Sequence, residues 1–290
     1  MRVLVLGAGL MGAQIGCEYA LGGHDVTMTA RDTARVADRV EETLAKAAEL
    51  SLHAAELATD ARERIAIDGA PPDAGWDLVV ESVPEDAELK AELLRPLAQG
   101  SPGAILATNT SSLSVTALGE AIGAPGRTIG THYWNPPLLM PLVEVVAGGG
   151  TSAETVSIVR DTLRELGKRP VLVRDVPGFV WNRIQMAVLR EATWVVEHGV
   201  ADTHTVDEIL THGLSRRWRN IGFFDAIALG GVATWQRTSA NLLPELSTAT
   251  ELPDLRRLAP DPAELTDVAA SRDRGLARDL LDERGERVAG

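Results

Sequence analysis

Cysteine is almost absent from this chain of 290 residues, and its scarcity limits the covalent and metal chemistry available. Because Cys17 is the only cysteine, no disulfide can form within the chain, and a metal site built from several thiolates is excluded. One free thiol fits a reducing compartment, so we expect a cytoplasmic protein without a metal centre. Cys17 itself is expected to be a small buried apolar side chain.

Long apolar runs and an excess of positive charge are also missing. No apolar segment reaches the roughly 18 residues that a membrane-spanning helix needs. The short apolar N-terminus is interrupted at Gly7, which is typical of a first strand rather than a signal peptide. The formal net charge is −13, so we expect neither nucleic acid nor anionic membrane as a partner.

Short apolar runs alternate with helical patterns through the first 176 residues. Strands are expected at Val3–Leu6, His24–Ala30, Trp76–Val83, Ala104–Thr108, Thr128–Tyr133, Leu142–Val146 and Val171–Val173. Helices are expected at Met11–Ala20, Thr33–Ala58, Glu85–Leu97, Val115–Ile122 and Ala153–Leu166. This alternation predicts an α/β fold with a Rossmann-like, doubly wound parallel sheet.

The pattern changes after Val176-Pro177-Gly178, where strand signals become rare and Phe179–His198 has the spacing of one long helix. We therefore predict a dinucleotide-binding domain over residues 1–176 and an all-helical substrate and dimerisation domain over 177–290. The long helix carries more apolar surface than one small domain readily buries, which favours a homodimer. The charged tail beyond Arg272 is expected to be a surface helix or a frayed terminus.

The strongest local motif is Gly7-Ala8-Gly9-Leu10-Met11-Gly12, which follows the first strand and opens the first helix. Gly7 permits the tight turn, Gly9 lets a pyrophosphate approach the backbone, and Gly12 lets the helix pack on the strand. The free N–H groups at Leu10 and Met11 would then face the phosphates. We therefore expect these residues to bind a nicotinamide dinucleotide.

The residues at the end of the second strand indicate whether a dinucleotide site prefers NAD or NADP. An NAD site usually has an acidic residue there, which binds the ribose 2′-hydroxyl. This chain has Ala30 followed by Arg31, and an arginine can pair with a 2′-phosphate. The pattern favours NADP, although Arg31 can also be a solvated surface residue. Asp32 is better interpreted as a helix N-cap or a turn residue.

Four further segments carry a family resemblance: Glu81-Ser82-Val83-Pro84-Glu85 with Lys90, Asn109-Thr110-Ser111-Ser112-Leu113, His132-Tyr133-Trp134-Asn135-Pro136-Pro137 running on to Glu144, and Val176-Pro177-Gly178-Phe179-Val180-Trp181-Asn182-Arg183. With the glycine turn, their order and spacing resemble the L-3-hydroxyacyl-CoA dehydrogenase family over residues 1 to about 235. The branch most resembled is that of lambda-crystallin/L-gulonate 3-dehydrogenase and L-carnitine dehydrogenase. The resemblance implies an NAD(P)-dependent enzyme that interconverts 3-hydroxyacyl and 3-ketoacyl groups on a small substrate, carried by CoA or a carrier protein or free as an acid.

The residues themselves support a proton relay. Oxidation of a secondary alcohol needs a base for the hydroxyl proton, and histidine suits this task because its pKa lies near neutrality. His132 lies at the end of an expected strand, where open α/β sheets bind ligands. Glu144 interrupts an apolar strand and needs a buried partner, so it is expected to orient the imidazole of His132.

The resemblance also assigns supporting residues. Ser111 and Asn182 match ligands of the substrate oxygen, and Glu85, Lys90 and Asn109 match positions near the nicotinamide ribose and carboxamide. Four of these five residues have a plainer interpretation. Ser111 and Asn182 can be helix caps, and Glu85 with Lys90 can lie on a solvated helix face.

Two departures leave the substrate open. Thr33–Ala58 is acidic on balance, whereas family members that act on CoA thioesters have a basic hairpin there, and Gly222-Phe223-Phe224-Asp225 replaces the usual substrate-side turn. An NADPH reductase related to 6-phosphogluconate dehydrogenases and imine reductases is a less favoured alternative, because the helix at Gly178 lacks the expected lysine. A non-catalytic nucleotide-binding protein on a recruited scaffold is the third possibility.

Overall fold

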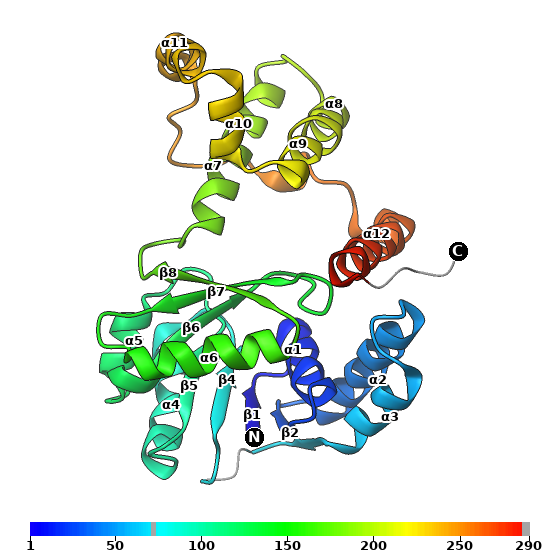
Figure 1. Ribbon diagram of the computed structural model, residues 1–290, viewed down its shortest axis with the longest axis vertical. Coiled ribbons are helices and arrows are strands. Elements are labelled where there is room, and N and C mark those ends of the chain that lie inside the picture. Colours follow the sequence, from blue (N-terminus) through cyan, green and yellow to red (C-terminus); the bar gives the residue numbers. More distant parts are fainter. Residues whose placement is uncertain (71–73, 286–290) are drawn as a thin grey trace. The chain divides into compact units, whose positions relative to one another are not determined.

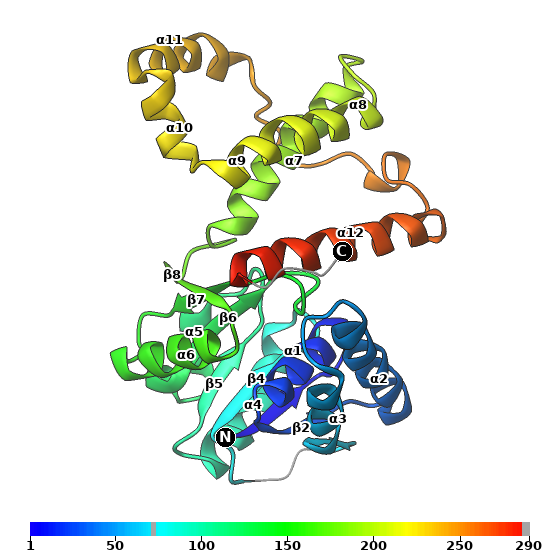
Figure 2. The same ribbon diagram turned by 45° about the vertical axis from the view of Figure 1, so that its right-hand side comes forward.

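The computed structural model describes residues 1–70 and 74–285, and the chain divides into two compact units. The first unit runs from Met1 to Val180 and is joined by the last helix, α12 (Thr266–Arg284). The second unit covers Trp181–Leu265 and is helical. Figures 1 and 2 show the sheet and its flanking helices in the first unit.

Within the described residues, the first unit contains one sheet of eight strands in the order β3-β2-β1-β4-β5-β6-β7-β8 (Figure 1). The strands are β1 (Arg2–Leu6), β2 (Asp25–Thr29), β3 (Ile65–Asp68), β4 (Leu78–Glu81), β5 (Ile105–Thr108), β6 (Thr128–Tyr133), β7 (Leu142–Ala147) and β8 (Arg169–Arg174). All neighbouring pairs are parallel except β6 and β7. The predicted doubly wound Rossmann-like sheet is confirmed.

Helices cover both faces of the sheet because the strands are apolar on both sides. Along β1, Val3 and Val5 pack in one core cluster and Leu4 and Leu6 in another, as the alternation of side chains in a strand requires. The first face is covered by α1 (Leu10–Leu21), α2 (Thr33–Glu49), α3 (Ala55–Glu63) and α6 (Ala153–Glu165). The second face is covered by α4 (Ala87–Gly100) and α5 (Val115–Ala121).

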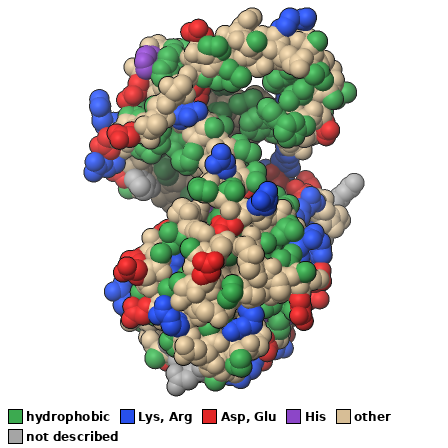
Figure 3. Space-filling model, turned by 90° about the vertical axis from the view of Figure 1, so that its left-hand side faces the viewer, with side chains coloured by type: hydrophobic (Ala, Val, Ile, Leu, Met, Phe, Trp, Pro, Cys, Tyr) green, Lys and Arg blue, Asp and Glu red, His purple; other side chains and the backbone are tan. Residues whose placement is uncertain are grey.

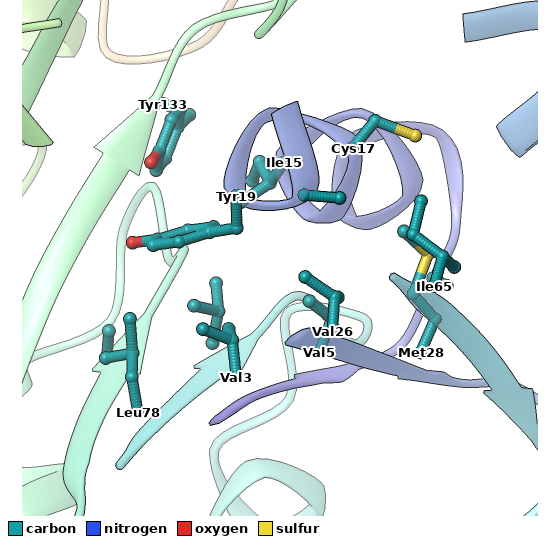
Figure 4. Close-up of a cluster of buried hydrophobic side chains, with 14 of the residues drawn as sticks. Val3, Val5, Ile15, Cys17, Tyr19, Val26, Met28, Ile65, Leu78 and Tyr133 are labelled. Carbon is teal, nitrogen blue, oxygen red and sulfur yellow. The ribbon is translucent and has the colours of Figure 1, made fainter. Parts of the chain in front are cut away.

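The core beneath α1 is drawn in Figure 4, where Ile15, Cys17 and Tyr19 of the helix lie over valines from β1 and β2. Cys17 is fully buried, which confirms its expected structural role. Burial raises the pKa of its thiol to about 12, so the thiolate is not formed at neutral pH.

One expected helix is two helices. The region expected to be helical over Thr33–Ala58 breaks after Glu49, where Ser51 has a positive φ of 56°, and α3 follows. The break was not predicted because the segment contains no glycine or proline and is rich in the helix formers Ala, Glu and Leu. The edge strand β3 was not expected from the sequence.

The C-terminal tail forms a helix, which is one of the two expectations, but its last turns are docked and not frayed. Three of its small or apolar residues, Ala277, Leu280 and Leu281, are buried in a cluster with Leu52 and Leu139 of the first unit. The helix is therefore packed rather than frayed, and it groups with the nucleotide-binding unit instead of with the helical region 177–290. A helix needs only a narrow apolar stripe to dock, and such a stripe is hidden in a charged segment.

The second unit consists of short helices that follow one long helix. They are α7 (Trp181–Glu197), α8 (Thr203–Glu208), α9 (Arg216–Asn220), α10 (Phe223–Gly230) and α11 (Val232–Leu242), with a π-helical stretch at Ile209–Ser215 between α8 and α9. The expected long helix is confirmed, with ends two residues later and one residue earlier than Phe179–His198. Among the described residues, no helix is long and apolar enough to cross a membrane.

Candidate active site

The glycine turn has the geometry that a bound pyrophosphate requires. Gly7 has a φ of +80°, and a Cβ atom there would lie 2.8 Å from Cγ1 of Val83. A Cβ on Gly12 would lie 2.4 Å from the carbonyl oxygen of Gly7, so helix and strand touch there. At Gly9, by contrast, the nearest atom would be 4.0 Å away. The fold itself has room for a side chain at Gly9, so packing does not explain this glycine, whereas the close approach of a pyrophosphate to the backbone would.

The first turn of α1 completes this cradle. Its N-cap is Gly9, which has no side chain to bond the first N–H groups. Leu10 and Met11 therefore begin a helix whose unpaired N–H groups are available to an anion. The residues present fit the pyrophosphate of a dinucleotide.

A cavity of about 560 Å³ extends from the glycine turn to the end of β2. It is lined by Gly7 and Gly9 and by three arginines, Arg31, Arg35 and Arg39. Within residues 1–70 and 74–285, none of these three guanidinium groups forms an ion pair with a carboxylate. The end of the cavity beside Arg31, Arg35 and Arg39 therefore carries positive charge, although the chain as a whole is acidic.

One carboxylate, that of Asp32, also lines this cavity, against the three arginines. Asp32 caps α2, and its Oδ1 accepts a hydrogen bond of 3.0 Å from the backbone N–H of Arg35. The predicted N-cap is confirmed. Ala30, at the position where an acidic residue would bind a ribose hydroxyl, contributes no acceptor side chain.

His132 and Glu144 are directly opposite each other on the antiparallel strands β6 and β7. Nδ1 of His132 lies 2.7 Å from Oε2 of Glu144, and both residues are buried. The other carboxylate oxygen, Oε1, accepts a 3.0 Å hydrogen bond from the N–H of Val180, and the ring of Phe179 lies 5.6 Å from the imidazole. The carboxylate is thus held at both oxygens, which fixes the orientation of the imidazole.

A fully buried ion pair joins Glu81, the last residue of β4, to Lys90 in α4. Nζ of Lys90 is 2.7 Å from Oε1 of Glu81, and neither side chain has any exposed surface. Oε2 of Glu81 also accepts a 2.6 Å hydrogen bond from Thr108. Lys90 therefore does not lie on a solvated helix face. Sequence reasoning assigned no role to Glu81, although a glutamate that ends an apolar strand signals a buried partner.

Glu85 joins this pair to the next loop. Its Oε2 lies 3.4 Å from Nζ of Lys90, and its Oε1 accepts hydrogen bonds from Thr110, Ser111 and Ser112. Partial burial alone would raise the pKa of Glu85, but the hydrogen bonds from Thr110 and Ser112 and the charge of Lys90 outweigh it and bring the pKa to about 2. Glu85 is therefore ionised at neutral pH.

Two more of the predicted residues lie between β5 and β6. Oδ1 of Asn109 accepts a 3.0 Å hydrogen bond from the N–H of Tyr133, the residue that follows His132. Ser111 does not cap α5, because that cap is Ser114, whose hydroxyl accepts from the N–H of Ala117. The interpretation of Ser111 as an N-cap is thus wrong.

Asn182 lies in the first turn of α7, in the second unit, and is partly buried there. Its part in a site with His132 stays a prediction. Among the described residues, no group of three or more His, Cys, Asp or Glu side chains is arranged to hold a metal ion.

Two family domains together match most of the chain, up to residue 259. Residues 2–176 match the NAD-binding domain of 3-hydroxyacyl-CoA dehydrogenase, and residues 178–259 match the C-terminal domain of the same family. The chain belongs to the 3-hydroxyacyl-CoA dehydrogenase family. Its first unit is accordingly an NAD-binding domain, and the family is one of oxidoreductases that act on a CH–OH group.

Known relatives of this 3-hydroxyacyl-CoA dehydrogenase family member support the expected branch. A probable 3-hydroxybutyryl-CoA dehydrogenase of Deinococcus radiodurans is 40% identical over 239 residues, covering 79% of this chain and 84% of that protein. An L-carnitine dehydrogenase of Streptomyces griseus is 33% identical over 295 residues, covering 95% of this chain and 88% of that protein. The crystal structure of an NAD⁺-dependent 5-formyl-3-hydroxy-2-methylpyridine 4-carboxylic acid 5-dehydrogenase matches 99% of both chains, at 28% identity and a TM-score of 0.87.

Proposed function

We propose that this protein is an NAD(P)-dependent dehydrogenase that interconverts a 3-hydroxyacyl and a 3-ketoacyl group, with His132 as the proton acceptor. The observation that carries the proposal is the buried contact of 2.7 Å between Nδ1 of His132 and the carboxylate of Glu144. Membership of the family and its NAD-binding domain support the reaction class.

The geometry assigns the proton. A carboxylate beside Nδ1 keeps the hydrogen of the neutral imidazole on that nitrogen, so Nε2 has a free lone pair. In the oxidation direction, Nε2 takes the hydroxyl proton of the substrate, and Glu144 stabilises the imidazolium that forms. The nicotinamide, when bound, supplies the acceptor or donor of the hydride. Ser111 and Asn182 would hydrogen-bond the reacting oxygen and stabilise its developing negative charge.

The test is kinetic and uses two variants. His132→Gln and Glu144→Ala should abolish turnover of a 3-hydroxy substrate, followed by nicotinamide absorbance, while the dissociation constant of the reduced cofactor stays near that of the wild type. Near-full activity in both variants would refute the relay. The substrate panel should contain 3-hydroxybutyryl-CoA, L-carnitine and free 3-hydroxy acids. The first two are included because relatives of this chain are named as dehydrogenases of these compounds.

We propose that the protein prefers NADP(H) to NAD(H) as its cofactor. Support comes from Ala30 and Arg31 at the end of β2, and from Arg35 and Arg39, which line the same cavity. The spacing of four residues along α2 puts Arg35 and Arg39 on one face of the helix. Comparison of the dissociation constants of NADPH and NADH by fluorescence titration decides this point, and tighter binding of NADH would contradict it.

A second candidate substrate class is an aldehyde on an aromatic acid. It is favoured by one observation, the match over 99% of both chains with the 5-dehydrogenase of a formyl-pyridine carboxylic acid. That match includes the stretch that forms α12 here. Turnover of an aromatic aldehyde acid in the absence of turnover of all 3-hydroxy substrates would favour this candidate over the first.

We also propose that the protein is a homodimer that associates through its second unit. Support comes from large apolar side chains exposed there: Phe224 and Leu229 each expose 81% of their surface, and Leu243 exposes 64%. Figure 3 shows hydrophobic side chains gathered over the helical unit. Exposed apolar patches of this kind mark association surfaces. A monomer in sedimentation at micromolar concentration would refute the proposal.

A further inference from the structure

The segment 175–180, which connects β8 to α7, contains a turn that does not suit one of its side chains. Gly178 and Phe179 have consecutive positive φ values of 74° and 49°. Glycine adopts this left-handed region readily, whereas a bulky side chain rarely does. The turn is closed by a 2.9 Å hydrogen bond from the N–H of Phe179 to the carbonyl oxygen of Val176. Glycine or asparagine would form it with less strain, so the backbone does not explain the phenylalanine.

The contacts of the Phe179 side chain explain its presence better. Phe179 exposes only 1% of its surface and belongs to an apolar cluster with Val115 and Val146. The centroid of its ring lies 5.6 Å from that of the His132 imidazole, and the two ring planes are tilted by 60°. The apolar ring fills space beside the imidazole that water would otherwise occupy. Exclusion of water strengthens the contact between His132 and Glu144.

The backbone that follows Phe179 reaches the carboxylate of the same pair. The N–H of Val180 donates a 3.0 Å hydrogen bond to Oε1 of Glu144, whose Oε2 lies 2.7 Å from Nδ1 of His132. The direction of this N–H depends on the backbone angles of Phe179, because Phe179 and Val180 share a planar peptide bond. The left-handed turn therefore sets the position of a donor that holds Glu144.

The start of the segment is attached to the first turn of α5. Oδ2 of Asp175 accepts a hydrogen bond of 2.8 Å from the hydroxyl of Ser114. It also accepts from the N–H and the hydroxyl of Thr116, at 2.8 and 2.6 Å. Val115, between these two residues, belongs to the cluster that contains Phe179. Contacts on both sides of the turn thus hold it in a conformation that it would otherwise leave.

We propose that Phe179 is a positioning residue of the proton relay. Its turn directs the N–H of Val180 to Glu144, and its ring keeps water away from His132. The inference rests on the proposed function, since His132 is the proton acceptor there. Strained backbone is retained where the surrounding contacts enforce it, and here the strained residue has one contact with each member of the relay through its ring and the peptide that follows it.

The first test needs no substrate. The proton between Nδ1 of His132 and Glu144 should give a downfield resonance in the proton NMR spectrum of protein labelled with ¹⁵N-histidine, assigned by its loss in His132→Gln. Phe179→Gly keeps the left-handed turn accessible but removes the ring, so this proton should exchange with water about tenfold faster or more. An unchanged exchange rate in Phe179→Gly would overturn the proposal.

Val115→Ala is the matched control for this experiment. It removes apolar volume from the same cluster but leaves the ring of Phe179 in place, so the exchange of the Nδ1 proton should stay near that of the wild type. Equal acceleration in Val115→Ala and Phe179→Gly would reduce the role of Phe179 to packing and would also overturn the proposal.

The second test shows whether Phe179 acts through the carboxylate. Phe179→Gly should lower kcat by up to about a hundredfold, the loss expected from misplacing a group by about 1 Å, and leave the KM of the substrate and the dissociation constants of NADH and NADPH unchanged. Added to Glu144→Gln, it should cost little more than Glu144→Gln alone, because the position of the carboxylate has no effect once the carboxylate is removed. Multiplicative losses in the double variant would overturn the positioning role.

The outcomes separate this role from the proposed function. Wild-type proton exchange in Phe179→Gly, together with an inactive His132→Gln, would overturn the role of Phe179 and leave the relay intact. Near-full activity of His132→Gln would refute the relay itself, whatever the exchange rate. If Phe179→Gly does not fold, Phe179→Leu keeps an apolar side chain but removes the aromatic ring. Faster exchange of the Nδ1 proton is then expected, and exchange at the wild-type rate would overturn the proposal.

Discussion

Replacement of Glu144 by glutamine tests the relay most directly, because it changes charge without changing shape. In the wild type, the carboxylate lies 2.7 Å from Nδ1 of His132 and receives the N–H of Val180 on its other oxygen. Glutamine can keep the bond to Val180 through its carbonyl oxygen, and its NH₂ group then faces Nδ1. The amide donates to Nδ1, so the hydrogen of the imidazole moves to Nε2 and the base is lost.

The size of the effect follows from the charge that is removed. For charge centres about 4 Å apart and an effective dielectric constant of about 20, the carboxylate stabilises the imidazolium by about 4 kcal/mol. At 1.36 kcal/mol for each tenfold in rate, this corresponds to roughly a thousandfold in kcat. We therefore expect Glu144→Gln to lower kcat by about that factor.

The assay follows nicotinamide absorbance under saturating cofactor, with cofactor affinity measured separately by fluorescence. Glu154→Gln is the matched control, because Glu154 is an exposed glutamate in the first turn of α6. A kcat within about threefold of the wild type in Glu144→Gln would show that the buried carboxylate does not set the state of the imidazole.

Three further predictions address the cofactor, pH dependence and packing. Arg31→Gln should weaken NADPH binding by about ten- to hundredfold and leave NADH binding unchanged, since a charged hydrogen bond contributes about 1.5–3 kcal/mol; equal changes for both cofactors would contradict the assignment. Burial raises the pKa of Glu18 to about 7, only partly opposed by Lys168, so the folded state binds its proton more tightly than the unfolded chain. The stability from this proton is fully present below about pH 4.5 and lost as the pH rises towards 7; Glu18→Gln should flatten this decline in urea unfolding, and an unchanged slope would argue against it. Leu281→Ala should lower the free energy of unfolding by about 2–5 kcal/mol, measured in urea, whereas a loss below about 0.5 kcal/mol would mean that α12 is not packed.

The sequence predicted those parts of the fold that depend on local patterns. Short β-rich runs between helical patterns located seven of the eight strands of the described sheet, with β6 correct at both ends, whereas the edge strand β3 was missed. The glycine turn was also predictable, because Gly7 and Gly12 meet steric limits that no other residue satisfies. A buried partner for Glu144 could be expected from its place in an apolar strand, and the resemblance to a family supported His132 as that partner, but their direct opposition across β6 and β7 came from the structure.

Features that depend on distant partners were not predictable. Lys90 could not be distinguished from a surface lysine until β4 and α4 put Glu81 beside it. The docking of α12 depends on Leu52 and Leu139, which are far away in the chain, while its own composition is mostly charged. Hydrophobic periodicity identifies which side of a helix is apolar, but it does not identify the part of the protein against which that side packs.

The return of α12 to the first unit has a practical consequence for fragments of this protein. An expression fragment that stops at Val180 would leave the cluster around Leu52 and Leu139 without its cover and exposed to water. Such a fragment should be prone to aggregation, and supplying Thr266–Arg284 as a separate peptide should restore its solubility. A protease that cuts the chain only after Val180 should likewise leave α12 bound to the first unit, although the cut separates the two covalently.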